Sequence, residues 1–224
     1  MTEPVGSVPG QANGDRNIMR EALLLALAAL LAGRAGIVDA IGYLHLSGLF
    51  VSYMSGNSTQ LAVALGQGNL GEAGTIAELI ALFVLGAAVG QVLADLTGSW
   101  LMTWVLTGVT ILLAISAMLA TAAEPMVFAM GALNASMHRA GRIAVSLTFV
   151  TGALVRFGQG LGHVLTGRTT EWNWLAQAVP WFGLIAGATI GSAVYMRIGE
   201  AAIWVGVVLA GLLAACSAAM RQPD

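Results

Sequence analysis

A cluster of polar residues interrupts the apolar stretch FVSYMSGNSTQLAVAL at residues 50–65. Hydroxyl and amide side chains of this kind bind polar solutes through hydrogen bonds. The types are also those found where helices begin, because Ser and Asn are favoured N-caps and Gly is a poor helix-interior residue. The stretch therefore predicts an extended segment, FVSYM, followed by a half-helix that starts near the cluster: Ser55, Gly56, Asn57, Ser58 and Thr59.

A second break of the same kind is predicted in the other half of the chain. Thr148-x-x-Thr151-Gly152 repeats the pattern Ser52-x-x-Ser55-Gly56, so SLTFV is expected to meet a half-helix near Thr151. The N-terminus of a helix offers free N–H groups and partial positive charge. Inside a membrane it suits an anion, a carboxylate or a polar solute, as in transporters with broken helices at the midplane. The alternative is that these side chains only hydrogen-bond neighbouring helices.

Charged residues within apolar segments are the other candidates for chemistry. Arg34 and Asp39 lie inside one such segment, where an isolated charge costs roughly 2.5–3.5 kcal/mol. Asp39 is the best candidate for a proton- or cation-coupling group, although a structural acid that caps a neighbouring helix fits equally well. Its counterpart in the second half is the neutral Asn134. Arg156, which aligns with Gln60, would either favour anionic solutes or extend to the cytoplasmic surface.

The composition indicates a membrane protein. Of 224 residues, 58% are hydrophobic and only 9% are charged, too few to cover a soluble core. Apolar runs near the length that crosses a bilayer recur along the chain. The net charge of −2 gives no reason to expect a nucleic-acid partner. The sequence therefore predicts an all-α polytopic membrane helix bundle in contact with the lipid bilayer.

The bundle is predicted to contain an internal duplication. Paired segments share small-residue and polar motifs in the same order, such as Gly86-Ala87-x-Val89-Gly90 and Gly187-Ala188-x-Ile190-Gly191. The glycines four apart are expected to let helices approach closely. The expected segments are 20–43, 50–66, 76–96 and 100–121, repeated as 125–138, 144–165, 175–196 and 199–219. We expect a disordered tail over 1–18 and two membrane repeats, 19–121 and 122–221, that form one membrane domain.

The distribution of arginines favours an inverted arrangement of the two repeats. If 50–66 and 144–165 each enter and leave on one side, six segments cross and only Arg197 among the seven flanking arginines stays outside. If all segments cross, the halves run parallel and the balance is poor. The length of 144–165 leaves the second arrangement open, so the two segments are predicted to be broken or re-entrant without a choice between crossing and re-entering.

No enzyme motif accompanies these features. The three histidines share no helical metal-ligand spacing, and HExxH, P-loop, Rossmann and GxSxG patterns are missing from the sequence. A single cysteine excludes an internal disulfide and a multi-cysteine metal site. We therefore expect no catalytic residues, no metal and no cofactor.

The runs GIVDAIGYLHLSGLFVSYMSGNSTQLAVAL and VTGALVRFGQGL resemble the YoaK family of bacterial integral membrane proteins, a domain of unknown function. The strongest matches are the MSGN joint at Met54–Asn57 and the VTG pattern at Val150–Gly152, and the resemblance covers nearly all of the chain after residue 18. It implies a multi-pass protein of the bacterial inner membrane with about six spans. It implies no substrate.

The sequence thus predicts membrane transport of a small polar or anionic solute. The alternatives are a non-transporting accessory protein or a lipid-modifying membrane enzyme, and assembly into a homo-oligomer stays open. The predicted substrate-binding residues are Ser52, Ser55, Gly56, Asn57, Ser58, Thr59, Thr148, Thr151, Gly152, Arg34 and Arg156, with Asp39 and Asn134 as coupling positions.

Overall fold

The computed structural model describes residues 9–119, 123–140, 150–168 and 173–219. Over these ranges the chain is helical and contains no strand, so the predicted helical membrane bundle is confirmed. The helices are α1 (Pro9–His45), α2 (Met54–Gly66), α3 (Leu70–Thr97), α4 (Leu101–Leu119), α5 (Glu124–Ala140), α6 (Val150–Leu165), α7 (Val179–Ile198) and α8 (Ile203–Ala219). Short 3-10 turns precede α4, α7 and α8.

The first helix begins earlier than the sequence analysis expected. α1 starts at Pro9, inside the segment 1–18 that was predicted to be a disordered tail, and residues 1–8 lie outside the described part, so the tail itself stays a prediction. Residues 9–18 include Gly and Asn, which are poor helix formers, so the extension depends on propagation from the apolar stretch, where each added residue needs no new helix nucleus. Proline is tolerated in the first turn, where its missing N–H costs nothing.

The helices differ in their capacity to cross a membrane. Three stretches of the described chain are long and apolar enough: Leu70–Thr97, Leu101–Leu119 and Trp174–Ala219, the last of which contains both α7 and α8. The 13 residues of α2 and the 16 of α6 extend only about 20 and 24 Å. Both are shorter than the hydrocarbon core of a bilayer, about 30 Å.

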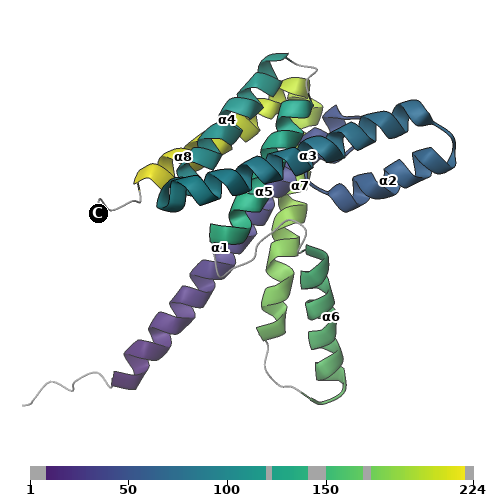
Figure 1. The fold of residues 1–224 in the computed structure, drawn as a ribbon. Helices are drawn as coiled ribbons and strands as arrows, with labels where there is room; N and C mark the ends of the chain where they lie inside the picture. The colour runs from purple at the N-terminus through teal and green to yellow at the C-terminus, as the bar shows by residue number, and fades with distance from the viewer. Residues whose placement is uncertain (1–8, 120–122, 141–149, 169–172, 220–224) are drawn as a thin grey trace, which may run out of the picture.

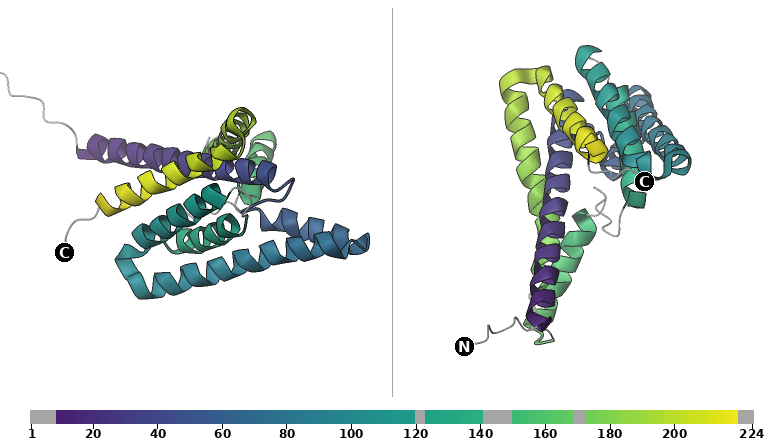
Figure 2. Two further views of the ribbon diagram at one scale, coloured as in Figure 1. Left: turned by 90° about the horizontal axis from the view of Figure 1, so that it is seen from above. Right: turned by 90° about the vertical axis from the view of Figure 1, so that its left-hand side faces the viewer.

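Helices α1 and α7 pack against each other through small residues (Figure 2, right). At each contact the backbones are so close that a Cβ on the α7 glycine would overlap a backbone carbonyl of α1. Close approach of this kind is the main use of small residues in membrane helices. The residue numbers of the contacting positions rise together along α1 and α7, so the two helices run parallel. The contacting pairs are Ala29 with Gly183, Gly33 with Gly187, and Ile37 with Gly191.

Helices α3 and α5 pack in the same way. Gly86 lies against the carbonyl of Phe128, and Gly90 lies against that of Ala132, so this pair is also parallel. A second pair of glycines makes corresponding contacts in the two helix pairs. Gly36 lies against the backbone of Leu184 and Ala188, and Gly131 lies against the backbone of Phe83 and Ala87.

Helices α4 and α8 run in opposite directions. The hydroxyl oxygens of Thr103 and Ser217 are 3.2 Å apart, near the start of one helix and the end of the other. Further along, Gly211 lies beside Thr110, and Gly206 lies beside Leu113. One series rises as the other falls, which is the signature of an antiparallel pair.

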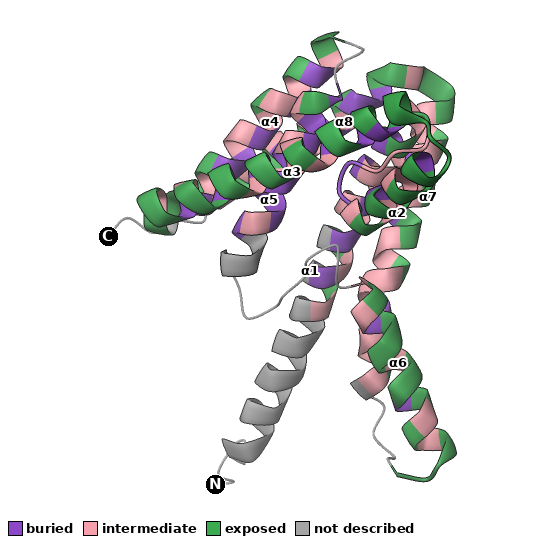
Figure 3. Ribbon diagram, turned by 45° about the vertical axis from the view of Figure 1, so that its right-hand side comes forward, coloured by how far each residue is buried: buried purple, intermediate pink, exposed green. Residues whose placement is uncertain are grey.

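The helices spread outward from a common centre (Figure 1). α4 lies beside α8, α2 lies beside one end of α3, and α6 lies beside the lower part of α7, whereas the lower part of α1 extends away from α6 in this view. Buried residues gather at the centre, whereas α2, α6 and much of α3 are exposed (Figure 3). The core contains Val38, Ile41, Val105, Val109, Leu113, Met126, Val127 and Ile203. The apolar outer faces imply contact with lipid.

Candidate functional site

The first break lies between α1 and α2. The chain leaves α1 after His45, turns through Ser47 and Gly48, which have φ values of +52° and +108°, and enters α2 at Met54. Positive φ is cheap for Gly and uncommon for Ser, so other contacts must hold this turn. The predicted change from non-helical chain to half-helix near Ser55 is therefore observed, one residue earlier.

Asn57 ties the break to its own helix. Its side-chain oxygen accepts a hydrogen bond from the Phe50 N–H at 2.9 Å, and its amide donates to the Phe50 carbonyl at 2.7 Å. The Asn57 side chain is fully buried. Gln60 adds a hydrogen bond from its amide to the Gly48 carbonyl at 3.0 Å. Polar groups of the loop are thereby paired within the protein, as a chain surrounded by lipid requires.

Asp39 ties the same loop to α1. One oxygen of its carboxylate, Oδ1, accepts from the Val51 N–H at 3.2 Å and from the Ser52 N–H at 3.0 Å. Val51 and Ser52 are both buried. The Ser52 hydroxyl lies near the carboxylate as well, although its geometry does not make a regular hydrogen bond. The acid therefore satisfies backbone groups that no helix or strand pairs.

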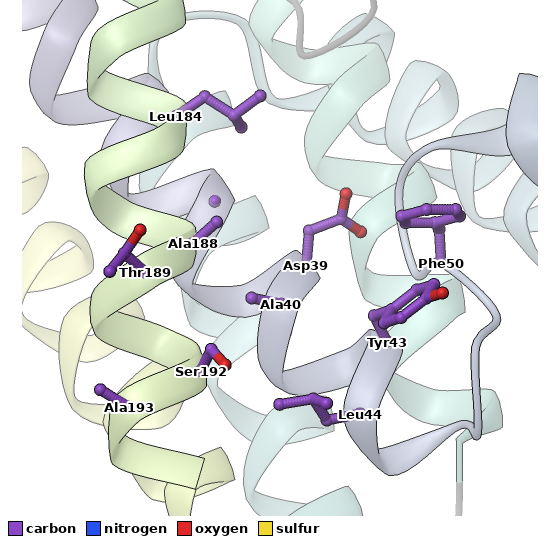
Figure 4. A pocket seen from close by; sticks show the side chains of 11 residues that line it. Asp39, Ala40, Tyr43, Leu44, Phe50, Leu184, Ala188, Thr189, Ser192 and Ala193 are labelled. Carbon is purple, nitrogen blue, oxygen red and sulfur yellow. The ribbon is translucent and has the colours of Figure 1, made fainter. Parts of the chain in front are cut away.

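A pocket of about 740 Å³ lies between α1, α7 and this loop (Figure 4). Its wall is mostly apolar, and Asp39 is the one charged residue among those that line it. Thr189 and Ser192 bring hydroxyl groups from α7, three positions apart and so on one helix face. The volume and the few polar groups are those of a site for a small organic molecule. The other lining residues are Gly36, Ala40, Tyr43, Leu44, Phe50, Leu184, Ala188 and Ala193.

Two aromatic rings form the loop side of the pocket. The ring centres of Tyr43 and Phe50 are 4.7 Å apart, and Phe50 in turn contacts Tyr53 edge-on at 5.3 Å. The Asn57 hydrogen bonds described above fix the backbone of Phe50, so the ring that borders the pocket is held by the break itself. The break and the pocket are thus parts of one structure.

The polar cluster at residues 55–59 mostly faces away from this pocket. Ser55, Ser58 and Thr59 are exposed. The Ser58 and Thr59 hydroxyls donate to carbonyls of their own helix, those of Met54 at 2.8 Å and Ser55 at 3.1 Å. Of the cluster, only Asn57 is buried, and it contacts the pocket through Phe50 rather than directly.

The predicted capping roles at this break are wrong. The N-cap of α2 is Tyr53, which makes no side-chain hydrogen bond, and Ser55 and Asn57 lie inside the first turns. The N–H groups of Gly56 and Asn57 donate to the Tyr53 carbonyl at 3.1 and 3.3 Å, so they are not offered to a solute. Asn57 reaches back to the loop because a buried loop carbonyl and N–H are costly to leave unpaired. A Cβ at Gly56 would meet the Tyr53 ring at 2.7 Å, so a larger residue there would have to displace that ring.

The second break is only partly described. Thr148 lies outside the described residues, as does the segment before Val150, where α6 begins. Thr151 is exposed in the first turn of α6, and Gly152 follows it half-buried. Neither residue lines the pocket next to Asp39.

The predicted charged and coupling residues lie apart from one another. Arg34 makes no ion pair with Asp39, as expected for residues five apart on a continuous helix. The Arg156 Nε donates to the Gln177 side chain at 2.8 Å near the start of α7, away from the pocket lining. Asn134 is buried and donates to the Met130 carbonyl of its own helix at 2.9 Å.

Sequence reasoning missed every lining residue except Asp39, including the four with hydroxyl or aromatic side chains: Tyr43, Phe50, Thr189 and Ser192. A signal existed for the α7 pair, because hydroxyl residues three apart in an apolar helix share one face. The aromatic pair gave none, since single aromatic residues near a break are also ordinary packing residues. No three His, Cys, Asp or Glu side chains in the described ranges gather as metal ligands.

Residues 27–216 match the family described as "Protein of unknown function (DUF1275)". The chain belongs to the DUF1275 family. YoaK is a member of DUF1275, so the resemblance drawn from the MSGN and VTG motifs is confirmed. Over 209 residues this DUF1275 protein is 40% identical to the UPF0700 transmembrane protein RA0705 of Rhizobium meliloti (strain 1021), with 88% of each chain covered. No solved structure matches it.

Proposed function

We propose that this DUF1275 protein transports a small polar solute across the bacterial inner membrane, with the pocket between α1 and α7 as its binding site. The observation that carries the proposal is the position of Asp39. Its carboxylate lines the pocket and also holds the Val51 and Ser52 backbone of the break. A group in this position senses both the occupant of the pocket and the state of the loop.

The double role of Asp39 supports a coupling function. A solute or proton that binds the carboxylate competes with the two loop N–H groups for its negative charge. Binding would then weaken the contacts that hold the loop against α1, and the loop backbone carries Phe50 at the pocket wall. In this way occupancy of the pocket is linked to movement of the break, which is what a transport cycle needs.

The charges around the pocket argue against an anionic solute. Asp39 is the one charged lining residue, and neither Arg34 nor Arg156 is among the residues that line the pocket. An acid facing an apolar cavity repels anions, because the electrostatic energy between charges is large in a medium of low dielectric constant. The proposal is therefore narrowed to a neutral or cationic polar solute.

The directions of the helices support two inverted repeats. If all eight helices crossed in turn, α4 and α8 would be parallel, but they run antiparallel. If α2 and α6 enter and leave on one side, α4 and α8 become antiparallel while α1 and α7, and α3 and α5, become parallel, as their contacts require. The short lengths of α2 and α6 agree with this arrangement. Inverted repeats around a midplane site are typical of secondary transporters.

The accessory-protein alternative predicts no central cavity and closed breaks. The pocket beside the first break favours transport instead. We expect no enzymatic activity, and the mechanism proposed here uses none.

The test is solute permeation into proteoliposomes. The chain is reconstituted with Cys216→Ser, and swelling is followed by light scattering in isosmotic glycerol, choline chloride and sodium acetate. We expect glycerol or choline, but not acetate, to enter faster than in protein-free liposomes. A membrane-impermeant maleimide on Ser192→Cys, a pocket residue, should slow entry, whereas the same reagent on exposed Thr59→Cys should not. Equal rates with and without protein for every solute would contradict the proposal.

A further inference from the structure

We propose that the solute is a small organic cation, an ammonium group with apolar substituents, bound between Asp39 and the Tyr43–Phe50 aromatic pair. The inference rests on the proposed function and adds the chemical class of the substrate. It follows from the charge, the aromatic wall and the size of the pocket.

The pocket contains a negative charge with no cation beside it. Both backbone hydrogen bonds of the Asp39 carboxylate go to Oδ1, and its other neighbour is the uncharged Ser52 hydroxyl, which makes no regular hydrogen bond with it. Arg34, on the same helix, forms no ion pair with it in the described chain. A carboxylate in mostly apolar surroundings is costly unless a cation or a proton joins it. Asp39 lines the pocket, and its side chain points toward Phe50 at the loop side of the pocket (Figure 4).

The wall of the pocket suits an organic cation better than a metal ion. Tyr43 and Phe50 line it side by side, and a cation over aromatic faces gains cation–π attraction in addition to its ion pair. A hard metal ion such as Ca²⁺ would need six to eight oxygen ligands, and the lining residues offer a carboxylate and three hydroxyl groups. Quaternary and primary ammonium groups need no such shell.

The remaining surface fits the rest of such a molecule. Leu44 and Leu184 supply an apolar surface for carbon substituents. Thr189 and Ser192 supply two hydroxyl groups on the α7 side, opposite the aromatic pair, where a hydroxyl or amide of the solute can bind. A volume of about 740 Å³ accommodates a molecule of several non-hydrogen atoms beyond the charged group.

The test compares choline with its uncharged isostere, 3,3-dimethylbutan-1-ol, and with acetate. Binding to the purified full-length protein in detergent is followed by the ligand-dependent rise in Tm and by calorimetry. We expect choline to bind about tenfold or more tightly than the isostere, and acetate not to bind, because only choline pairs with the acid and the rings. Equal binding of choline and the isostere would overturn the inference.

Variants separate the charge from the fold. Asp39→Asn keeps an oxygen that can accept from Val51 and Ser52 but removes the charge, so choline binding should fall about tenfold or more while Tm without ligand changes little. Tyr43→Leu removes the cation–π contact and should weaken choline more than the isostere. The matched control is Glu78→Gln, an exposed acid on α3, which should bind choline as the native chain does. Choline binding that survives Asp39→Asn would overturn the inference.

The two proposals fail in different ways. Glycerol permeation without choline binding leaves transport standing and removes the cation. Choline binding that depends on Asp39, with no permeation of any solute, keeps the cation site and removes transport.

Discussion

The side chain of Asn57 forms a closed hydrogen-bonded ring with the backbone of Phe50, seven residues earlier in the chain. The ring satisfies both polar groups of one loop residue with one buried side chain. Phe50 lines the pocket and Asn57 does not. Asn57 therefore affects the pocket indirectly, by fixing the backbone of Phe50. This relationship explains why an amide, rather than a hydroxyl, stands at the centre of the break.

Replacing Asn57 with Leu is expected to destabilise the protein by about 2–6 kcal/mol, because two backbone groups lose their partner at about 1–3 kcal/mol each. The stability of Asn57→Asp should lie between those of the native protein and the Leu variant, because a carboxylate oxygen can still accept a hydrogen bond from the Phe50 N–H. The measurement is unfolding in detergent followed by circular dichroism. Ser58→Ala is the control, because Ser58 is exposed and bonds only to its own helix. A Leu variant as stable as the control would show that the ring is dispensable.

Adding a methyl group at Gly187 is expected to disrupt the α1–α7 pair. A Cβ there would overlap the Gly33 carbonyl, a backbone atom that no change of rotamer can move. Overpacking typically costs about 1–3 kcal/mol, and more where backbones must separate. Gly187→Ala should therefore lower Tm and reduce the yield of monodisperse protein. The control is Gly108→Ala on α4, where nothing lies within 4 Å, and which should be neutral or slightly stabilising. Similar behaviour of both variants would argue against the parallel contact.

The direction of α8 relative to α4 can be tested by crosslinking. In a Cys216→Ser background, Thr103→Cys with Ser217→Cys should form a disulfide on mild oxidation, because the native hydroxyl oxygens are 3.2 Å apart. Thr103→Cys with Trp204→Cys should not, since these residues lie near opposite ends of the antiparallel pair. Mobility on non-reducing gels reports the result. Preferential crosslinking of the second pair would require parallel helices and would exclude the inverted arrangement.

The sidedness of the chain follows from the same arrangement. With α2 and α6 entering and leaving on one side, a reporter fused after Arg142 should be cytoplasmic and one fused after Arg197 should be periplasmic. Paired alkaline phosphatase and fluorescent-protein fusions measure both. A periplasmic signal after Arg142 would be incompatible with six crossings.

Much of the fold could be predicted from the sequence. Low charge and recurring apolar runs indicate a helical membrane protein. The chain has too few charged residues to cover a water-exposed surface, and a helix pairs its own backbone groups where lipid offers no partners. The breakers placed most helix ends within a few residues, and the glycines four apart indicated close helix contacts, which Gly187 and Gly191 make. The start of α1 was missed because a polar, glycine-containing segment resembles a tail when its continuation from an apolar helix is ignored.

The candidate site shows where local reasoning stops. Ser55, Ser58 and Thr59 were predicted to bind a solute because of their hydroxyl groups. In the structure all three are exposed on α2, and the hydroxyls of Ser58 and Thr59 donate to carbonyls of their own helix. Asp39 was recognised because a charge in an apolar helix is costly wherever it faces. Its partners were not, since Val51 and Ser52 offer backbone groups that leave no mark in the sequence.

By itself, then, the sequence determined the class of protein, the approximate helices and the first break, because these follow from local composition and from the solvent that the chain must tolerate. The tertiary structure decided which helices pair, in which directions they run and what surrounds Asp39. Those properties depend on contacts between α1 and α7, far apart in the chain, and the energy of such contacts is set by shape rather than by residue type.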